Sequence, residues 1–259
     1  MKKILSTMRH AIDKYNLIED GDKIAIGVSG GKDSLVLLKA MAMYKKFSKQ
    51  KYEIVAITID MFNNPSYFEK VAKLCDELEI AYYIVPSDIY DIVFNIRKEK
   101  NPCSLCSKLR RGMLNTKALE LGCNKLALAH SLDDLTHTFL LSLFYEGRMS
   151  TLSPKSYMTR TKMTVIRPLI LTEESAIIAS SKTLPVTKSG CPADKHTQRE
   201  HIKQALSMIQ SEFPDALDRI NSALTHPERN NLLLTDAYYM GDTFIKNAIQ
   251  KENEKNKNK

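Results

Sequence analysis

The sequence of 259 residues lacks long apolar runs and has few cysteines. No stretch approaches the roughly 18 consecutive apolar residues that a transmembrane helix needs. The first residues contain no apolar run of signal-peptide length, so we expect a cytoplasmic protein without a membrane partner. The 5 cysteines are an odd number and too few for a disulfide framework in a chain of this length. Reduced thiols, some of them serving as metal ligands, are therefore expected.

Positive charge is in excess and is concentrated in two stretches. The chain has 38 lysines and arginines against 30 aspartates and glutamates. Residues 97–111 and residues 147–167 each carry a net charge of +5, and the rest of the chain is slightly acidic. Such clustering is typical of proteins that bind a polyanion, although two solvated basic loops would give the same pattern. Nucleic acid is therefore a candidate partner.

Short β-branched runs alternate with helical patterns over most of the chain. Strands are predicted at residues 23–28, 52–60, 81–85, 126–129 and 164–166. Helices are predicted between them at residues 34–44 and 67–78. Buried strands separated by helices favour an α/β fold with a doubly wound parallel sheet. In such sheets, ligands bind at the carboxyl ends of the strands.

The C-terminal part of the chain has a purely helical pattern. Helices are predicted at residues 195–210, 215–225 and 230–249. The tail at residues 251–259 contains no apolar residue and is predicted to be disordered. We therefore expect an α/β domain at residues 1–190, a helical segment at residues 191–250 that carries Cys191, and the tail.

The first predicted strand runs directly into a glycine-containing loop, Ser29-Gly30-Gly31-Lys32-Asp33-Ser34. Glycines let backbone N–H groups approach an anion closely, and the following helix N-terminus adds donors and a positive dipole end. Lys32 contributes a charge, and two serine hydroxyls contribute donors. The loop has neither Walker A spacing nor the G-x-G-x-x-G dinucleotide pattern. An ordinary glycine turn is the alternative, but the pattern favours a phosphate-binding loop.

Three cysteines are candidate metal ligands. Cys103 and Cys106 form a C-x-x-C motif, which we expect in a long connection, and Cys191 follows about 85 residues later. Two residues between thiols let both face one metal centre, but the motif alone fits a redox pair, a zinc site or an iron–sulfur site. Structural zinc would need a fourth ligand, for which His196 is available. The other two cysteines are expected to be structural: Cys75 and Cys123.

A histidine and two acids follow the fourth predicted strand, in the segment His130-Ser131-Leu132-Asp133-Asp134. The acids stand at a predicted helix start, where they can be stabilised by the helix dipole or can bind Mg²⁺. Plain N-capping would explain the same residues.

The SGGKDS loop after a short strand resembles the PP-loop of the ATP pyrophosphatase family, the adenine nucleotide alpha hydrolases. Members of this family split ATP between the α- and β-phosphates and adenylate an oxygen. The resemblance implies a PP-loop ATP-binding domain in which residues 29–34 hold the pyrophosphate part of ATP. It also implies that Asp60 and Met61 lie near the adenosine and that His130 belongs to the nucleotide site.

A narrower resemblance covers residues 20–205 and combines SGGKDS, CSLCSKLRR, AHSLDD, IRPL and a distal cysteine. This combination is similar to the TtcA family, the tRNA 2-thiocytidine synthetases. It implies a 4Fe-4S cluster on Cys103, Cys106 and Cys191. ATP with Mg²⁺ would adenylate the C2 oxygen of an anticodon-loop cytidine, and sulfur carried on the cluster would replace that oxygen. The residues with implied catalytic roles are Lys32, Asp33, Asp133, Asp134, Cys103 and Cys106.

The same resemblance implies tRNA as a partner and a sulfur donor such as the product of a cysteine desulfurase. A homodimer is common in this family. The chain departs from the family pattern G-H-x-x-D-D-x-x-E-T, because Ala129 replaces the glycine and His137 replaces the glutamate. One alternative is a tRNA lysidine synthetase, which needs no cysteine cluster, or another PP-loop adenylating enzyme. The other alternative is a non-catalytic nucleotide- or RNA-binding relative with a structural zinc (Zn²⁺).

Overall fold

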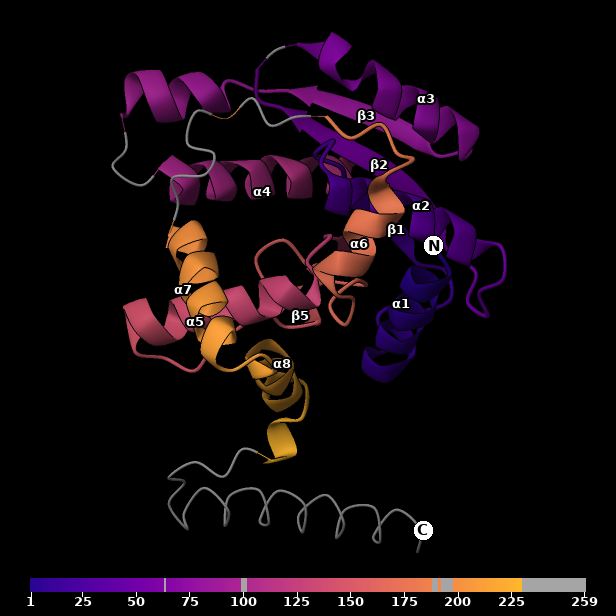
Figure 1. The fold of residues 1–259 in the computed structure, drawn as a ribbon. Coiled ribbons are helices and arrows are strands. Elements are labelled where there is room, and N and C mark those ends of the chain that lie inside the picture. The colour runs from indigo at the N-terminus through magenta and orange to yellow at the C-terminus, as the bar shows by residue number, and fades with distance from the viewer. Residues whose placement is uncertain (63, 99–101, 188–190, 192–197, 230–259) are drawn as a thin grey trace, which may run out of the picture. The chain divides into compact units, whose positions relative to one another are not determined.

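A computed structural model of the chain describes residues 1–62, 64–98, 102–187, 191 and 198–229 (Figure 1). The chain divides into two compact units, residues 1–217 and residues 218–259. The first unit contains the whole sheet and the described candidate site residues. In the part of the chain that the structure describes, no helix is long and apolar enough to cross a membrane.

Six strands form one sheet in the spatial order β3-β2-β1-β4-β6-β5. Their bounds are β1 (Lys23–Gly27), β2 (Glu53–Asp60), β3 (Ala81–Pro86), β4 (Lys125–Ala127), β5 (Lys155–Met158) and β6 (Met163–Ile166). The predicted α/β fold is confirmed, and the five predicted strands are mutually parallel. The sixth, β5, is antiparallel to β6 and was not predicted. Its sequence, Lys-Ser-Tyr-Met, has no apolar run, because an edge strand buries little of its surface.

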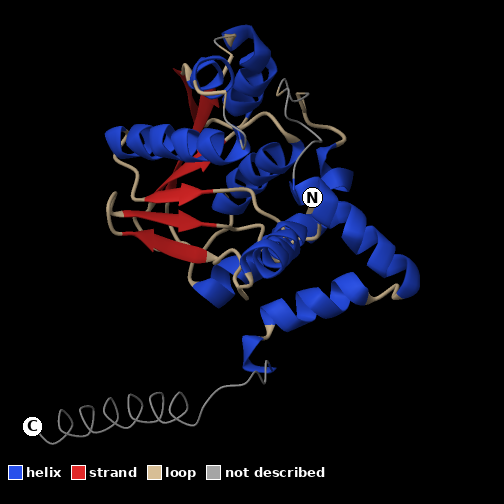
Figure 2. Ribbon diagram, turned by 90° about the vertical axis from the view of Figure 1, so that its left-hand side faces the viewer, coloured by secondary structure: helices blue, strands red, loops and turns tan. Residues whose placement is uncertain are grey.

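Helices of the first unit pack around this sheet (Figure 2). Their bounds are α1 (Lys2–Tyr15), α2 (Lys32–Lys45), α3 (Glu69–Glu77), α4 (Pro102–Glu120), α5 (Leu132–Glu146), α6 (Glu174–Ser181) and α7 (Gln198–Glu212). Helix α8 (Ala216–Thr225) lies mostly in the second unit. The described residues also contain three short helical segments: η1 (Pro65–Phe68), η2 (Asp91–Ile96) and η3 (Pro227–Arg229). The predicted helices at residues 34–44, 67–78, 195–210 and 215–225 match α2, η1 with α3, α7 and α8. The predictions for residues 230–249 and 251–259 lie outside the described residues.

The two faces of the sheet are covered by different helices. On one face, Leu114 and Ala118 of α4 pack against Ala25, Val55 and Leu126 of three neighbouring strands. Side chains alternate along a strand, so the fully buried isoleucines on either side of Ala25 point to the opposite face. That face is covered by α2, which also contacts α1 and α6. This burial on both faces explains why the central strands read as continuous apolar runs.

The C-x-x-C motif lies in the first turn of α4, so the expectation of a long connection was wrong. Pro102 occupies the first helical position, where its missing N–H costs nothing. The whole helix is 19 residues long. Its helical pattern was hard to see in the sequence because α4 buries few side chains: Leu114, Asn115 and Ala118.

The first compact unit extends beyond residue 190, where we expected the α/β domain to end. Helix α7 packs on α5 (Figure 1). Arg199 of α7 forms an ion pair with Asp134 of α5 at 2.6 Å. The first helix after Cys191 therefore belongs to the same unit as the sheet.

Truncating Leu114 should test how much the packing of α4 on the sheet contributes to the stability of the fold. Leu114→Ala should lower the free energy of unfolding by about 2–5 kcal/mol, because it removes a buried side chain and leaves a cavity. Leu119→Ala on the same helix is the matched control, since Leu119 is 42% exposed, and should cost less than about 1 kcal/mol. Urea denaturation measures both values. Equal losses would contradict the described packing of α4.

Candidate functional site

The carboxyl ends of β1 and β4 lie side by side, because these strands pair in parallel with Ile26 opposite Ala127. The strands that follow β1 in the chain, β2 and β3, lie on one side of it in the sheet. The later strands β4 and β6 lie on its other side. The gap between β1 and β4 is therefore the topological switch point, where ligands of open α/β sheets bind. The glycine loop leaves β1 at this edge, and the His130 segment leaves β4 beside it.

The loop at residues 29–34 is closed by its own serines. The N–H of Ser29 donates to Oγ of Ser34 over 3.1 Å, and that hydroxyl donates to the carbonyl of Gly31 over 2.9 Å. Gly30 has a φ of +80°, which only glycine adopts without strain. Gly31 is the N-cap of α2 and has no side chain with which to cap the first N–H groups. These groups can therefore bind an anion.

The lysine of this loop is held by two acids. Nζ of Lys32 lies 3.1 Å from Asp33 and 2.8 Å from Glu174, the first residue of α6. Burial raises the pKa of Asp33, against the lowering effect of the Lys32 charge. Burial also acts to raise the pKa of Glu174, but its hydrogen bond and charge contact with Lys32 hold that pKa below its usual range. Lys32 therefore carries a full positive charge at the mouth of the loop.

Both acids of the His130 segment are bound by protein donors. Asp133 accepts a hydrogen bond from the N–H of Glu174 over 2.6 Å, which caps the start of α6. Asp134 forms a capping box with Ser131 at the start of α5 and pairs with Arg199. Burial alone would raise the pKa of Asp134, but the Ser131 N–H and the Arg199 charge hold it below its usual range. N-capping is thus one role of these acids in the folded chain.

His130 is paired with Arg167, which the sequence showed only as part of the IRPL motif and of a basic stretch and which was not predicted to be a site residue. Nε of Arg167, just after β6, donates to Nδ1 of His130 over 3.2 Å. Burial, followed by the charge of Arg167, lowers the pKa of His130 to about 4. The available signal was the position of Arg167 directly after a predicted strand. Glu174 and Arg199 gave no comparable signal, because each meets its partner only through the fold.

One cavity of about 350 Å³ joins the glycine loop to the three candidate cysteines. Its lining includes Val28, Ser29, Cys103, Cys106, Arg110, Arg111, His130 and Cys191. The three cysteines come from α4 and from a segment far along the chain. The fold therefore brings together the two features that the sequence shows as separate motifs.

The residues expected near the adenosine lie at the end of β2. Asp60 is buried, and its Oδ1 accepts a hydrogen bond from the N–H of Phe62 over 3.0 Å. Its Oδ2 has no hydrogen-bond partner among the described residues. The thiol of Cys106 contacts Sδ of Met61 at 3.8 Å, so this strand end reaches the cysteines.

The three candidate cysteines line one cavity, but their side chains are not arranged as a metal-binding site among the described residues. Within the described residues, no three or more His, Cys, Asp and Glu side chains are arranged to hold a metal ion. Burial raises the pKa of the Cys106 thiol, and the nearby charge of Arg110 opposes this. The two cysteines expected to be structural, Cys75 and Cys123, are buried. His196, the fourth ligand of the zinc alternative, lies outside the described residues.

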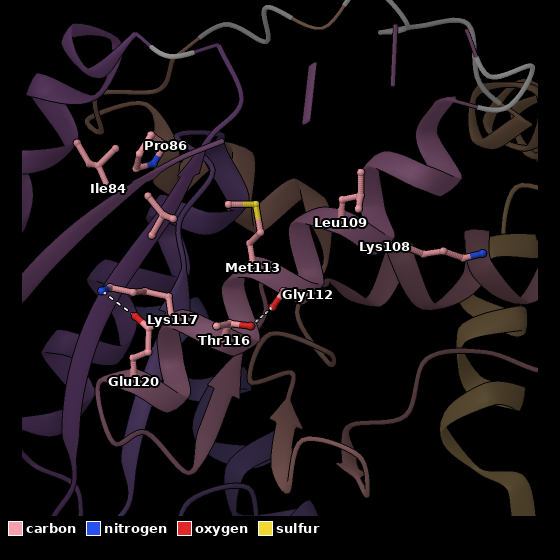
Figure 3. A pocket seen from close by; sticks show the side chains of 10 residues that line it. Ile84, Pro86, Lys108, Leu109, Gly112, Met113, Thr116, Lys117 and Glu120 are labelled. Carbon is pink, nitrogen blue, oxygen red and sulfur yellow. Dashed lines mark hydrogen bonds and ion pairs between the residues drawn. The ribbon is translucent and has the colours of Figure 1, made fainter. Parts of the chain in front are cut away.

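A second cavity of about 590 Å³ lies between α4 and the edge strand β3 (Figure 3). Its wall includes Ile84, Pro86, Leu109 and Met113, and Lys117 pairs with Glu120 at its rim (Figure 3). None of the candidate site residues lines this cavity, so it is separate from the loop and the cysteines.

Comparison with known proteins agrees with this geometry. The sequence pattern of the PP-loop domain family matches residues 2–207. The tRNA-cytidine(32) 2-sulfurtransferase of Geobacter sulfurreducens is 38% identical over 90% of this chain and 92% of its own length. That of Saccharophagus degradans is 35% identical over 97% of this chain and 83% of its own length. This chain belongs to the TtcA branch of the PP-loop family. The predicted resemblance is therefore confirmed.

A solved structure shows the same architecture as this PP-loop protein. It is the U34-tRNA thiolase NcsA from Methanococcus maripaludis, determined with its 4Fe-4S cluster. The two chains superpose with a TM-score of 0.71 at 25% sequence identity, over 90% of this chain and 81% of NcsA.

Glu174 should weaken nucleotide binding, because its carboxylate competes with phosphate for Lys32. Glu174→Gln should lower the dissociation constant for a non-hydrolysable ATP analogue about fivefold, since a partly exposed ion pair is worth about 1 kcal/mol at most. The control is Glu173→Gln, because Glu173 pairs with Lys3 on the surface. Calorimetric titration measures both constants. Weaker binding by the Glu174 variant would mean that this carboxylate orients Lys32 instead.

Proposed function

We propose that this protein is an ATP-dependent tRNA sulfurtransferase. It adenylates the C2 oxygen of a tRNA cytidine in the anticodon loop and replaces that oxygen with sulfur. The observation that carries the proposal is the single cavity lined by the PP-loop, by His130 and by Cys103, Cys106 and Cys191. A tRNA lysidine synthetase would have no use for three cysteines at this place.

The PP-loop residues would bind the pyrophosphate part of ATP, with Mg²⁺ as counter-ion. The free N–H groups at the start of α2 and the charge of Lys32 are positioned to neutralise charge that develops on the leaving pyrophosphate. Asp60 and Met61 would lie near the adenosine. Asp33, Asp133 and Asp134 would act beside the phosphates, once ATP and Mg²⁺ compete with their present partners.

Cys103, Cys106 and Cys191 would hold a 4Fe-4S cluster. The donor set fits, because thiolates are the usual ligands of such clusters and all three thiols line one cavity. Because the chain would supply three ligands, a bound cluster would have one iron without a protein ligand, and that iron would be available to carry sulfur. Burial raises the pKa of the Cys106 thiol, and the charge of Arg110 opposes that rise, so Arg110 would favour the thiolate form that binds metal. The sulfur would come from a donor such as a cysteine desulfurase product.

Exposed basic residues would bind the tRNA phosphates. Arg110 and Arg111 line the cavity, and Arg160 and Lys162 are exposed on the second basic stretch. Not every charge of this stretch is available. Lys155 pairs with Glu19, and Arg167 is buried against His130 and Ser153. A cytoplasmic location and a homodimer would complete this proposal.

Removing the PP-loop charges should abolish ATP turnover. Lys32→Ala should lower tRNA-dependent pyrophosphate release at least about 100-fold, because the positive charge that neutralises the leaving pyrophosphate is lost. Asp33→Ala should cause a similar loss, because Asp33 Oδ1 lies 3.1 Å from Lys32 Nζ and holds that charge in place at the loop. Lys45→Ala, an exposed lysine on the same helix, should keep the parental rate. Thermal unfolding monitors the fold of each variant. Parental rates in both loop variants would refute the assignment of this loop.

The metal can be identified from colour and composition. Anaerobically purified protein should absorb visible light and contain iron and sulfide. Cys103→Ala, Cys106→Ala and Cys191→Ala should each lose both the absorbance and 2-thiocytidine formation, measured by nucleoside mass spectrometry. Cys123→Ala, which alters a buried cysteine outside the cavity, and His196→Ala should retain iron. Colourless protein with one zinc and no sulfide would exclude the cluster while leaving the ATP site in place.

A further inference from the structure

The hydrogen bond between Arg167 and His130 fixes which ring nitrogen carries the proton. Nε of Arg167 donates to Nδ1 of His130 over 3.2 Å, and Nη1 of Arg167 donates to the carbonyl of Ser153 over 2.5 Å. A guanidinium group has only donors, so Nδ1 must present its lone pair. The neutral ring then carries its single proton on Nε2.

The surroundings of His130 keep the ring neutral. Arg167 is buried, so its charge is poorly screened. Burial, followed by the charge of Arg167, lowers the pKa of His130 from 6.5 to about 4. Arg199 of α7 and Arg111 of α4 act in the same direction, while Asp134 of α5 opposes them. The ring is therefore uncharged at neutral pH.

The neutral ring has one polar group left to offer. His130 lines the cavity together with Ser29 of the PP-loop and the three cysteines. With Nδ1 occupied by Arg167, Nε2–H is the ring's remaining hydrogen-bonding group. A protonated nitrogen of a neutral imidazole donates a hydrogen bond but cannot accept a proton. His130 therefore cannot act as a general base while the Arg167 bond is intact.

We propose that Arg167 is a positioning residue that holds His130 in its Nε2–H form, so that this N–H donates to a substrate oxygen bound in the cavity. The proposal rests on the proposed function, because it requires ATP or a tRNA base in this cavity. Two oxygens have the required acceptor chemistry: a phosphate oxygen of the nucleotide and the carbonyl oxygen of the base. A neutral donor binds either one without adding a charge.

The tautomer can be observed directly, without substrates, by ¹⁵N NMR of the histidine rings. The signals of His130 are those lost in His130→Gln. In the parental protein, Nε2 should be protonated and Nδ1 unprotonated to about pH 5. Arg167→Met should give mixed tautomers and a pKa shifted upward, because a donor and a positive charge are lost. Arg167→Lys keeps a hydrogen-bond donor and a positive charge, and should therefore restore the tautomer and the pKa in part. An Arg167→Met protein with the parental tautomer and pKa would overturn the positioning role.

Three substitutions of His130 test the donor itself. Gln places an amide N–H near the position of Nε2, Asn places it near Nδ1, and Ala has none. His130→Gln should remain within about tenfold of the parental thiolation rate, and the Asn and Ala variants should lose about 100-fold. If the Asn and Ala variants also bind ATP more weakly in the absence of tRNA, the acceptor of the Nε2–H hydrogen bond is a phosphate oxygen of the nucleotide. A loss confined to thiolation would assign it to the base.

A Gln variant as inactive as the Ala variant would overturn the donor role, although parental thiolation would still support the proposed function. A parental protein that makes no thiocytidine would contradict the proposed function alone. The tautomer and the ATP affinities do not depend on that product.

Discussion

Parallel pairing of β1 with β2 on one side and β4 on the other is the constraint on which the site depends. It places the ends of three strands at one edge of the sheet. The ladder continues past the strands, because Val28 donates to Ile57 over 2.8 Å and Leu128 donates to Ile166 over 3.0 Å. The PP-loop and the His130 segment therefore leave the sheet from neighbouring, fixed positions. Helix α4 covers the same edge with its N-terminal cysteines.

A second connection joins the PP-loop to Thr187, which precedes the distal cysteine in the chain. Thr187 donates two hydrogen bonds to the carbonyl of Gly30, from its N–H over 3.0 Å and from its hydroxyl over 3.1 Å. A Cβ on Gly30 would collide with this hydroxyl, so the close approach requires glycine. Thr187 precedes Cys191 by four residues. The phosphate loop is thus bound, through one carbonyl, to a residue that stands four positions before the third candidate cluster ligand.

Three polar side chains of the site take partners from distant elements. Lys32 meets Glu174, Asp134 meets Arg199, and His130 meets Arg167. Such partners stabilise charges that are partly or fully removed from water, because burying an unpaired charge is costly. The partners also set the protonation states, and those states decide what the motif residues can do. His130 is an example. The hydrogen bond from Arg167 leaves its Nε2–H able to donate and leaves the ring unable to act as a general base.

The sequence by itself determined the parallel strands, the PP-loop and the family. These features are encoded locally: a buried strand shows as an apolar run, and a phosphate loop needs glycines at fixed spacing. The start of α4, the edge strand β5 and the convergence of three cysteines on one cavity were decided only by the tertiary structure. So were the Arg167–His130 bond and the engagement of Lys32 by Glu174. Each depends on a contact between residues far apart in the chain, and no local pattern records such a contact.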